Sequence, residues 1–151
     1  MKPHGKIISS FIVGVLLLSS CSPFTTTLPS GFASYGGILK KRSVSPNQVV
    51  FRVRYVKNKP YAGFDFWREA LPKRMRDAGY RIVSDSVVTI NNRKALLLEM
   101  ITPLGSYDYS YIVMMSIKKK KILLAEAAGT VDEFRKQREE VFAALHKTSF
   151  K

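Results

Sequence analysis

The fold is decided by two neighbouring apolar runs, KALLLEMI at residues 94–101 and YDYSYIVMMSI at residues 107–117. Both are short and rich in strand-forming residues, and turn residues around Pro103 and Gly105 separate them. Neither run alternates throughout between apolar and polar residues, as a strand with one wet face would. We therefore expect two antiparallel strands in the middle of a sheet whose faces are both covered.

Further strands are predicted on either side of this pair. The segments 81–90 and 121–128 are again rich in β-forming residues, and the earlier segment 48–56 alternates between apolar and polar residues. The pair Asn91 and Asn92 suits the positive backbone angles of a tight hairpin turn. The four later strands are therefore predicted to follow one another as an antiparallel meander.

Two helical segments are predicted to cover the sheet. Apolar residues recur at spacings of three and four between residues 64 and 78, although Pro72 predicts a kink or a division into two short helices. The second helix is predicted to begin at Thr130, which has Glu133 at the capping-box spacing. One helix on each face gives an α+β fold, an antiparallel meander in an α/β/α sandwich. The inward stripe of the second helix is expected to contain Val131, Phe134, Val141, Phe142 and Leu145.

The start of the chain has the parts of an export signal. Two lysines precede an apolar run at residues 7–18, which is shorter than the roughly 20 residues that span a bilayer. The next residues resemble a bacterial lipobox, in which Leu18, Ser19 and Ser20 form the signal-cleavage site and Cys21 is lipidated. An ordinary signal peptide or a short membrane helix is the alternative.

The lipobox resemblance implies a location. In lipoproteins the cysteine is diacylated and becomes the new N-terminus, and Ser22, in place of Asp, favours the outer membrane over the inner one. We expect a protein of the cell envelope that is lipid-anchored and faces the periplasm. The predicted divisions are a signal peptide at 1–20, a lipidated tether at 21–45, rich in Ser, Thr, Pro and Gly, and one α/β/α domain at 46–151.

Charge narrows the choice of partner. Cleavage before Cys21 would leave 131 of the 151 residues, with 23 basic and 11 acidic side chains and a formal charge of +12. Such a charge favours anionic partners, either anionic lipid or an acidic face of another envelope protein. Nucleic acid is not expected as a partner of an exported protein.

The mature chain lacks the usual catalytic sets. His146 is its one histidine, Cys21 is its one cysteine, and the carboxylates Asp65 and Glu69 have no His or Cys at a metal-ligand spacing. We therefore predict no enzyme activity, no catalytic residues, no metal site and no cofactor.

Two groups of residues are candidates for binding. Lys118, Lys119, Lys120 and Lys121 form a basic turn that could contact an anionic surface, or simply a solvated turn. Tyr107, Tyr109 and Tyr111 point to one face of a strand and, together with Trp67, could line a ligand groove. The simpler interpretation is that these aromatic residues pack under a helix.

The order of these features resembles a known family. Ala78-Gly79-Tyr80 at a helix end, then Val87 to Ala95 running into an apolar strand, is similar to the PsbP/Mog-type fold, which includes DcrB-like bacterial envelope lipoproteins. The residues from Lys121 to Leu124 and the closing Thr148-Ser149-Phe150 agree with that pattern. The resemblance covers residues 49–150 and implies a non-catalytic role in binding or stabilising a partner.

Three functions follow in order of preference. The first is a non-enzymatic, lipid-anchored accessory or binding lipoprotein for a membrane-associated or anionic partner. The second is a periplasmic module that binds a small molecule or lipid in the aromatic groove. An envelope hydrolase is the third.

Overall fold

The computed structural model describes residues 23–35 and 41–151. The predicted signal peptide and Cys21 lie outside these residues. In chain order the elements are β1 (Phe24–Thr25), β2 (Ala33–Tyr35), β3 (Lys41–Val44), β4 (Val50–Lys57), α1 (Phe64–Asp77), β5 (Arg81–Ile90), β6 (Arg93–Leu104), β7 (Tyr107–Lys118), β8 (Lys121–Thr130), α2 (Val131–Lys136), α3 (Arg138–His146) and β9 (Ser149–Phe150).

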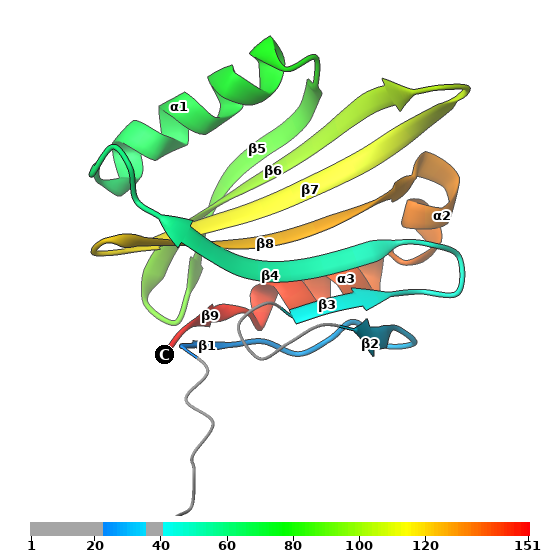
Figure 1. Ribbon diagram of the computed structural model, residues 1–151, viewed down its shortest axis with the longest axis horizontal. Coiled ribbons are helices and arrows are strands. Elements are labelled where there is room, and N and C mark those ends of the chain that lie inside the picture. The colour runs from blue at the N-terminus through cyan, green and yellow to red at the C-terminus, as the bar shows by residue number, and fades with distance from the viewer. Residues whose placement is uncertain (1–22, 36–40) are drawn as a thin grey trace, which may run out of the picture.

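A twisted antiparallel sheet forms the centre of the domain (Figure 1). Its strand order is β2-β3-β4-β8-β7-β6-β5, so the four later strands form the predicted meander and β4 joins its β8 edge. The long hairpins that connect β5 to β8 follow from the apolar runs and from Asn91 and Asn92, both of which have positive φ. A second, two-stranded sheet pairs β1 with β9.

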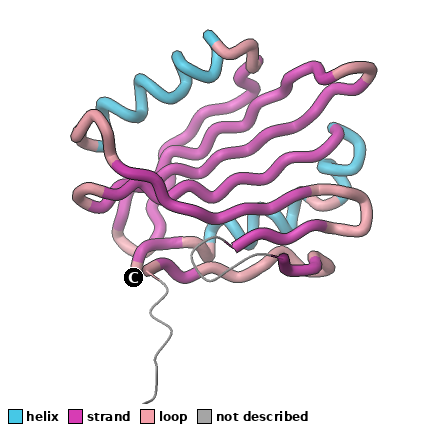
Figure 2. The backbone as a smooth tube through the Cα atoms, in the orientation of Figure 1, coloured by secondary structure: helices cyan, strands magenta, loops and turns pink. Residues whose placement is uncertain are grey.

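Helices lie on both faces of the large sheet, which confirms the predicted α+β class. The first core cluster contains Phe134 of α2 and Leu145 of α3, together with inward residues such as Phe51. The second cluster lies under α1, where Trp67 and Leu71 pack against it. Figure 2 shows these helices on opposite sides of the strands. Both faces of β6 and β7 are therefore buried, as their apolar runs require.

The helices differ from the prediction in two places. α1 continues as one helix through Pro72. Leu71 and Met75, one before and one after the proline, pack on the same cluster, so burial on both sides opposes a break. The C-terminal helix is instead divided at Gln137 into α2 and α3, and Thr130 makes no side-chain cap bond. Thr130 is still paired with Tyr109 as the last residue of β8.

The segment predicted as a tether, 21–45, belongs largely to the domain where the structure describes it. β1, β2 and β3 lie within it, and Phe24 is only 1% exposed. Phe24, Leu28 and Phe32 pack in the first core cluster, so these apolar residues outweigh the turn-rich composition around them. Of the predicted tether's described ranges, 23–35 and 41–45 are thus tied to the folded domain.

Candidate functional site

The basic turn is held in place by a buried asparagine. Asn58 follows β4, is 4% exposed, and donates its backbone N–H to the carbonyl oxygen of Lys120 at 2.9 Å. Its Nδ2 donates to the carbonyl oxygens of Lys119, at 3.0 Å, and of Ala62, at 2.8 Å. Its Oδ1 accepts a 2.7 Å bond from Nε1 of Trp67. Asn58 therefore ties the β7–β8 turn to the following loop and to α1.

A cavity of about 660 Å³ lies beside this turn. Its walls combine the four lysines with the apolar side chains of Pro23, Tyr61 and Phe150, and with Lys151. Tyr61 is 72% exposed. Exposed aromatic and basic side chains together are typical of protein surfaces at a membrane interface. Such side chains have an apolar body and a polar end that stays in water. We call the residues around this cavity the basic end.

The lysines of the basic end have different surroundings. Lys118 Nζ donates to the backbone oxygen of Lys151, and Lys121 Nζ lies 5.0 Å from the centre of the Tyr55 ring. Lys119 and Lys120 are exposed, and the structure shows no ion pair for either among the described residues. These two ammonium groups are free to contact an anionic surface.

The predicted aromatic groove is not assembled as one site. Trp67 is bonded to Asn58, which contacts the turn that follows β7, whereas Tyr107 begins β7 and is 66% exposed. The two ends of a strand as long as β7 are about 36 Å apart, so Trp67 and Tyr107 do not line one groove. Tyr109 is half-buried, and Tyr111 packs against Tyr80 with ring centres 5.6 Å apart. Trp67 and Tyr111 contribute to packing under α1, as the simpler interpretation has it.

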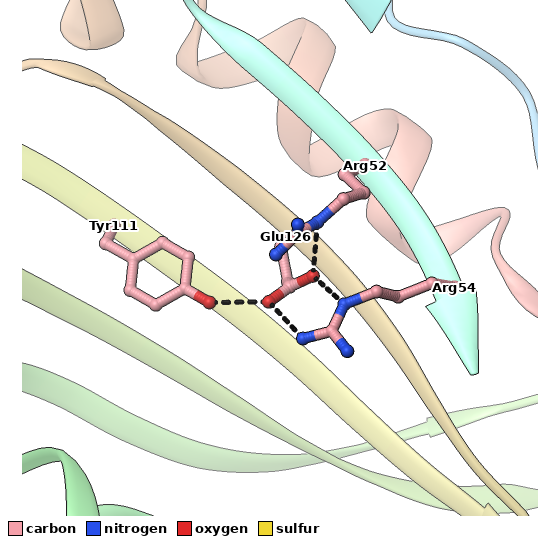
Figure 3. Close-up of polar contacts among 4 residues, drawn as sticks. All are labelled: Arg52, Arg54, Tyr111 and Glu126. Atoms are coloured by element: carbon pink, nitrogen blue, oxygen red, sulfur yellow. Dashed lines mark hydrogen bonds and ion pairs between the residues drawn. The ribbon is translucent and has the colours of Figure 1, made fainter. Parts of the chain in front are cut away.

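A second polar site surrounds Glu126, a carboxylate in the middle of the apolar strand β8. Its side chain is 5% exposed. Arg54 forms a two-bond fork with it, Nε to Oε2 at 2.9 Å and Nη2 to Oε1 at 3.2 Å, while Arg52 Nε donates to Oε2 at 2.8 Å. The Tyr111 hydroxyl donates to Oε1 at 2.7 Å from the other side (Figure 3). The buried carboxylate is therefore fully hydrogen-bonded.

These contacts set the protonation states of the cluster. Burial alone would raise the pKa of Glu126, but the hydrogen bonds from Arg54, Arg52 and Tyr111 outweigh it and lower that pKa below its usual value. Burial, and then the adjacent carboxylate, raise the pKa of the Tyr111 hydroxyl. The hydrogen bond to Glu126 raises the pKa of Arg52. The site at neutral pH therefore holds an ionised carboxylate, a neutral tyrosine and cationic arginines.

The residues considered for catalysis are dispersed. His146 is exposed in the last turn of α3, and Asp65 and Glu69 line an open cavity of about 520 Å³ beside Arg68 and Arg76. In the part of the chain that the structure describes, no three His, Cys, Asp or Glu side chains are grouped as metal ligands. In the same residues, no helix has the length and apolar character needed to cross a membrane.

Sequence reasoning missed Asn58 and Glu126. Asn58 lies between the strand predicted at 48–56 and the helix predicted from residue 64, and nothing local distinguishes a buried asparagine in such a connection from an exposed one. Glu126 carried a signal, since it is the one charged residue between Ile122 and Thr130, in a strand of a sheet whose faces are both predicted to be covered. Its partners Arg52 and Arg54 are on the polar face of the alternating strand β4.

Fold and site together describe an α+β module with a basic end and a buried ion-pair cluster. No protein-family model matches the chain, and no curated protein matches its sequence. Solved structures do share the fold, among them LpqN, which is involved in cell envelope biogenesis of Mycobacterium tuberculosis. The TM-score is 0.66 at 12% identity, over 85% of this chain and 83% of that one.

Two further structures are similar. The cyanobacterial PsbP of Synechocystis sp. PCC 6803 matches with a TM-score of 0.63 at 8% identity, over 85% of this chain and 87% of that one. A protein of unknown function from Pseudomonas aeruginosa matches with a TM-score of 0.61 at 10% identity, over 76% of this chain and 94% of that one. The PsbP-like fold that the sequence predicts is thereby confirmed.

Proposed function

We propose that this protein is a lipid-anchored, non-enzymatic accessory module of the cell envelope that docks its basic end on the anionic headgroups of the membrane that holds it. One observation carries the proposal. Pro23 lines the same cavity as Lys118 to Lys121, and Pro23 follows the lipobox-like Cys21 by two residues.

The short separation between Cys21 and Pro23 matters because two residues are too few to act as a flexible tether. Two residues of chain span at most about 7 Å. If Cys21 is acylated, its lipid therefore enters the membrane next to the basic turn. Exposed lysines then lie within about one Debye length of the headgroups, where each contributes roughly 1 kcal/mol of attraction to an anionic leaflet. Lys119 and Lys120 are the two best placed, since both are exposed and, unlike Lys118 and Lys121, neither has its ammonium group bound to another described residue.

The apolar walls of the basic end support the same orientation. A single acyl chain anchors a protein only marginally, so stable anchoring takes a second signal such as a basic patch. Tyr61 is exposed beside that patch and suits the interface between headgroups and hydrocarbon. The envelope role of the structurally similar LpqN agrees with this location. In this orientation the Glu126 cluster and the α1 face are left accessible to a partner.

Vesicle sedimentation tests the docking step. Residues 22–151 contain both described core clusters, all of whose buried residues lie between Phe24 and Phe150. This domain is mixed with phosphatidylcholine vesicles with and without phosphatidylglycerol across a salt series. We expect binding only to the anionic vesicles, weakened by salt, and weakened by about tenfold in Lys119→Gln/Lys120→Gln, from two charges at roughly 1 kcal/mol each with partial screening.

The matched control is Arg74→Gln/Arg81→Gln, which removes the same charge. Both arginines are exposed, and both lie away from the β7–β8 turn, at the end of α1 and the start of β5. The control should bind like the wild type. Equal loss in both variants would show attraction by net charge alone, and the absence of salt-dependent binding would refute docking by the basic end.

The cavity at the basic end favours a second candidate, a lipid-binding module. Its volume of about 660 Å³ lies within the range of small-ligand sites. Saturable binding of a soluble short-chain phosphatidylglycerol, at unchanged affinity in high salt, would support this candidate over docking on a leaflet.

A further inference from the structure

α1 covers only part of the sheet face that carries it. α1 contacts β5 and β6, at one edge of the sheet, and its core cluster also includes Ile122 of β8, with Val56 of β4 packed against it near the basic end (Figure 1). Toward the β2 edge of the same face is a cavity of about 220 Å³ whose polar walls are Tyr35, Arg42, Arg52, Tyr111 and Glu126. The ion-pair cluster of Figure 3 is one side of this cavity.

Four of these residues form a row straight across the sheet. Tyr35 is paired with Arg42, Arg42 with Arg52, and Arg52 with Glu126. Directly opposite residues in antiparallel strands point to the same face, with Cβ atoms about 5 Å apart. Two arginines are therefore direct neighbours, an arrangement that disfavours the folded state unless an anion compensates their charges.

The one carboxylate in the cluster does not balance both arginines. Glu126 is already held by the two-bond fork from Arg54, and Arg52 reaches it through Nε alone. Among the described residues, the side chain of Arg42 makes no hydrogen bond or ion pair, and the terminal nitrogens of Arg52 make none. Arg42, Arg52 and Glu126 line the cavity and Arg54 is bonded to Glu126, so these four side chains together have a surplus of two positive charges.

We propose that this cavity binds a phosphate monoester, with its dianionic group between the guanidinium groups of Arg42 and Arg52. A phosphate monoester carries close to two negative charges at neutral pH, which matches the surplus. Guanidinium groups bind phosphate oxygens by paired, charge-assisted hydrogen bonds. Glu126 and Arg54 hold Arg52 in place, and Tyr35, at the rim, is 46% exposed and offers a ring to the rest of the ligand. The site is separate from the basic end.

Calorimetric titration of the full chain in a non-ionic detergent tests the proposal, with inorganic phosphate and glycerol 3-phosphate as probes. We expect saturable binding to the wild type and at least about tenfold weaker binding to Arg42→Gln, since a charge-assisted bond is worth more than one factor of ten. Arg42→Gln leaves every bond to Glu126 intact, so its folding is not at issue. Arg42→Lys should be intermediate, because it retains the charge without the fork.

Two controls make the result specific. Arg81→Gln removes the same charge from β5, an edge strand on the far side of the sheet, and Lys119→Gln/Lys120→Gln removes two charges from the basic turn. Both variants should bind phosphate like the wild type. The Nε–H signals of Arg42 and Arg52 in nitrogen-correlated NMR spectra should shift with phosphate. Absence of saturable binding, or equal affinity in Arg42→Gln, would overturn the proposal and leave a purely structural ion-pair cluster.

The same titration identifies the source of the phosphate group. Glycerol 3-phosphate binding at least as tightly as dihexanoyl phosphatidic acid supports a soluble phosphate ester as the ligand. Tighter binding of dihexanoyl phosphatidic acid, lost in Arg42→Gln, supports a lipid headgroup. Both results depend on Arg42, whereas docking by the basic end depends on Lys119 and Lys120. Each of the two proposals can therefore be refuted without refuting the other.

Discussion

The backbone N–H of Lys151 donates a hydrogen bond to the carbonyl oxygen of Pro23 at 3.3 Å. The last residue of the chain thus contacts the first residue that the structure describes, and Phe24 pairs with Phe150 next to it. This contact places the start of the domain beside the basic turn. The orientation proposed for the anchored protein depends on it.

The first prediction concerns the segment whose composition suggests a tether. Phe24 is 1% exposed and meets Tyr55 edge to face at 5.7 Å. Phe24→Ala should lower the free energy of unfolding by about 3 to 5 kcal/mol, measured by urea unfolding of residues 22–151. Phe66, which is 49% exposed, is the matched control, and Phe66→Ala should cost about 1 kcal/mol for its ring contact with Trp67. Equal effects would mean that Phe24 is outside the core.

The bond between Asn58 and Trp67 supports a second prediction. Asn58→Ala removes the acceptor of the Trp67 Nε1–H and the donor to Lys119, at an expected cost of about 2 to 3 kcal/mol. Trp67→Phe removes the indole donor. In a double-mutant cycle followed by circular dichroism, the two changes should couple by about 1 kcal/mol. Strict additivity would contradict a direct bond.

The Glu126 cluster predicts a pH dependence of stability. The folded-state pKa of Glu126 lies below its ordinary value of 4.5, so the ionised carboxylate stabilises the fold above that pH. This stabilisation is lost as the pH falls through the lowered pKa. Glu126→Gln should therefore lower the free energy of unfolding by about 2 kcal/mol at pH 7. This is less than the cost of breaking a fully buried ion pair, because Arg52 and Arg54 are partly exposed to solvent.

The pH series supplies the control for that substitution. The difference between wild type and Glu126→Gln, measured by denaturant unfolding at each pH, should shrink as the pH falls below 4.5. A difference that stays constant down to acid pH would mean that the two forms differ in packing rather than in charge.

Two phenylalanines of the predicted inward stripe should differ in how much stability is lost when each is truncated to alanine. Phe134 is 3% exposed, whereas Phe142 is half-buried with the Arg138 guanidinium 4.2 Å from its ring centre. Phe134→Ala should cost about 3 to 5 kcal/mol and Phe142→Ala about half as much, measured by thermal unfolding. The reverse order would place Phe142 in the core.

Much of the sheet follows from local patterns. Residues 81–90 form a strand with the predicted ends, and the strands from β6 to β8 extend the predicted segments by a few residues. Paired strands extend as far as their partners continue, and the sequence pattern of one strand does not show where its neighbour ends. The division of the last helix at Gln137 also escapes local reasoning, because the stripe has helical spacing on both sides of the break.

The sequence by itself determined the fold class, because the meander and the covering helices follow from local patterns. The strong positive charge is likewise a sum over residues, and the lipobox resemblance is a local pattern. Only the tertiary structure decided which residues form sites. Arg42, Arg52 and Glu126 become neighbours through strand pairing between distant segments, and Pro23 reaches the basic turn through β9. Such contacts depend on the register and order of strands, which are set by packing across the whole sheet rather than by any one segment.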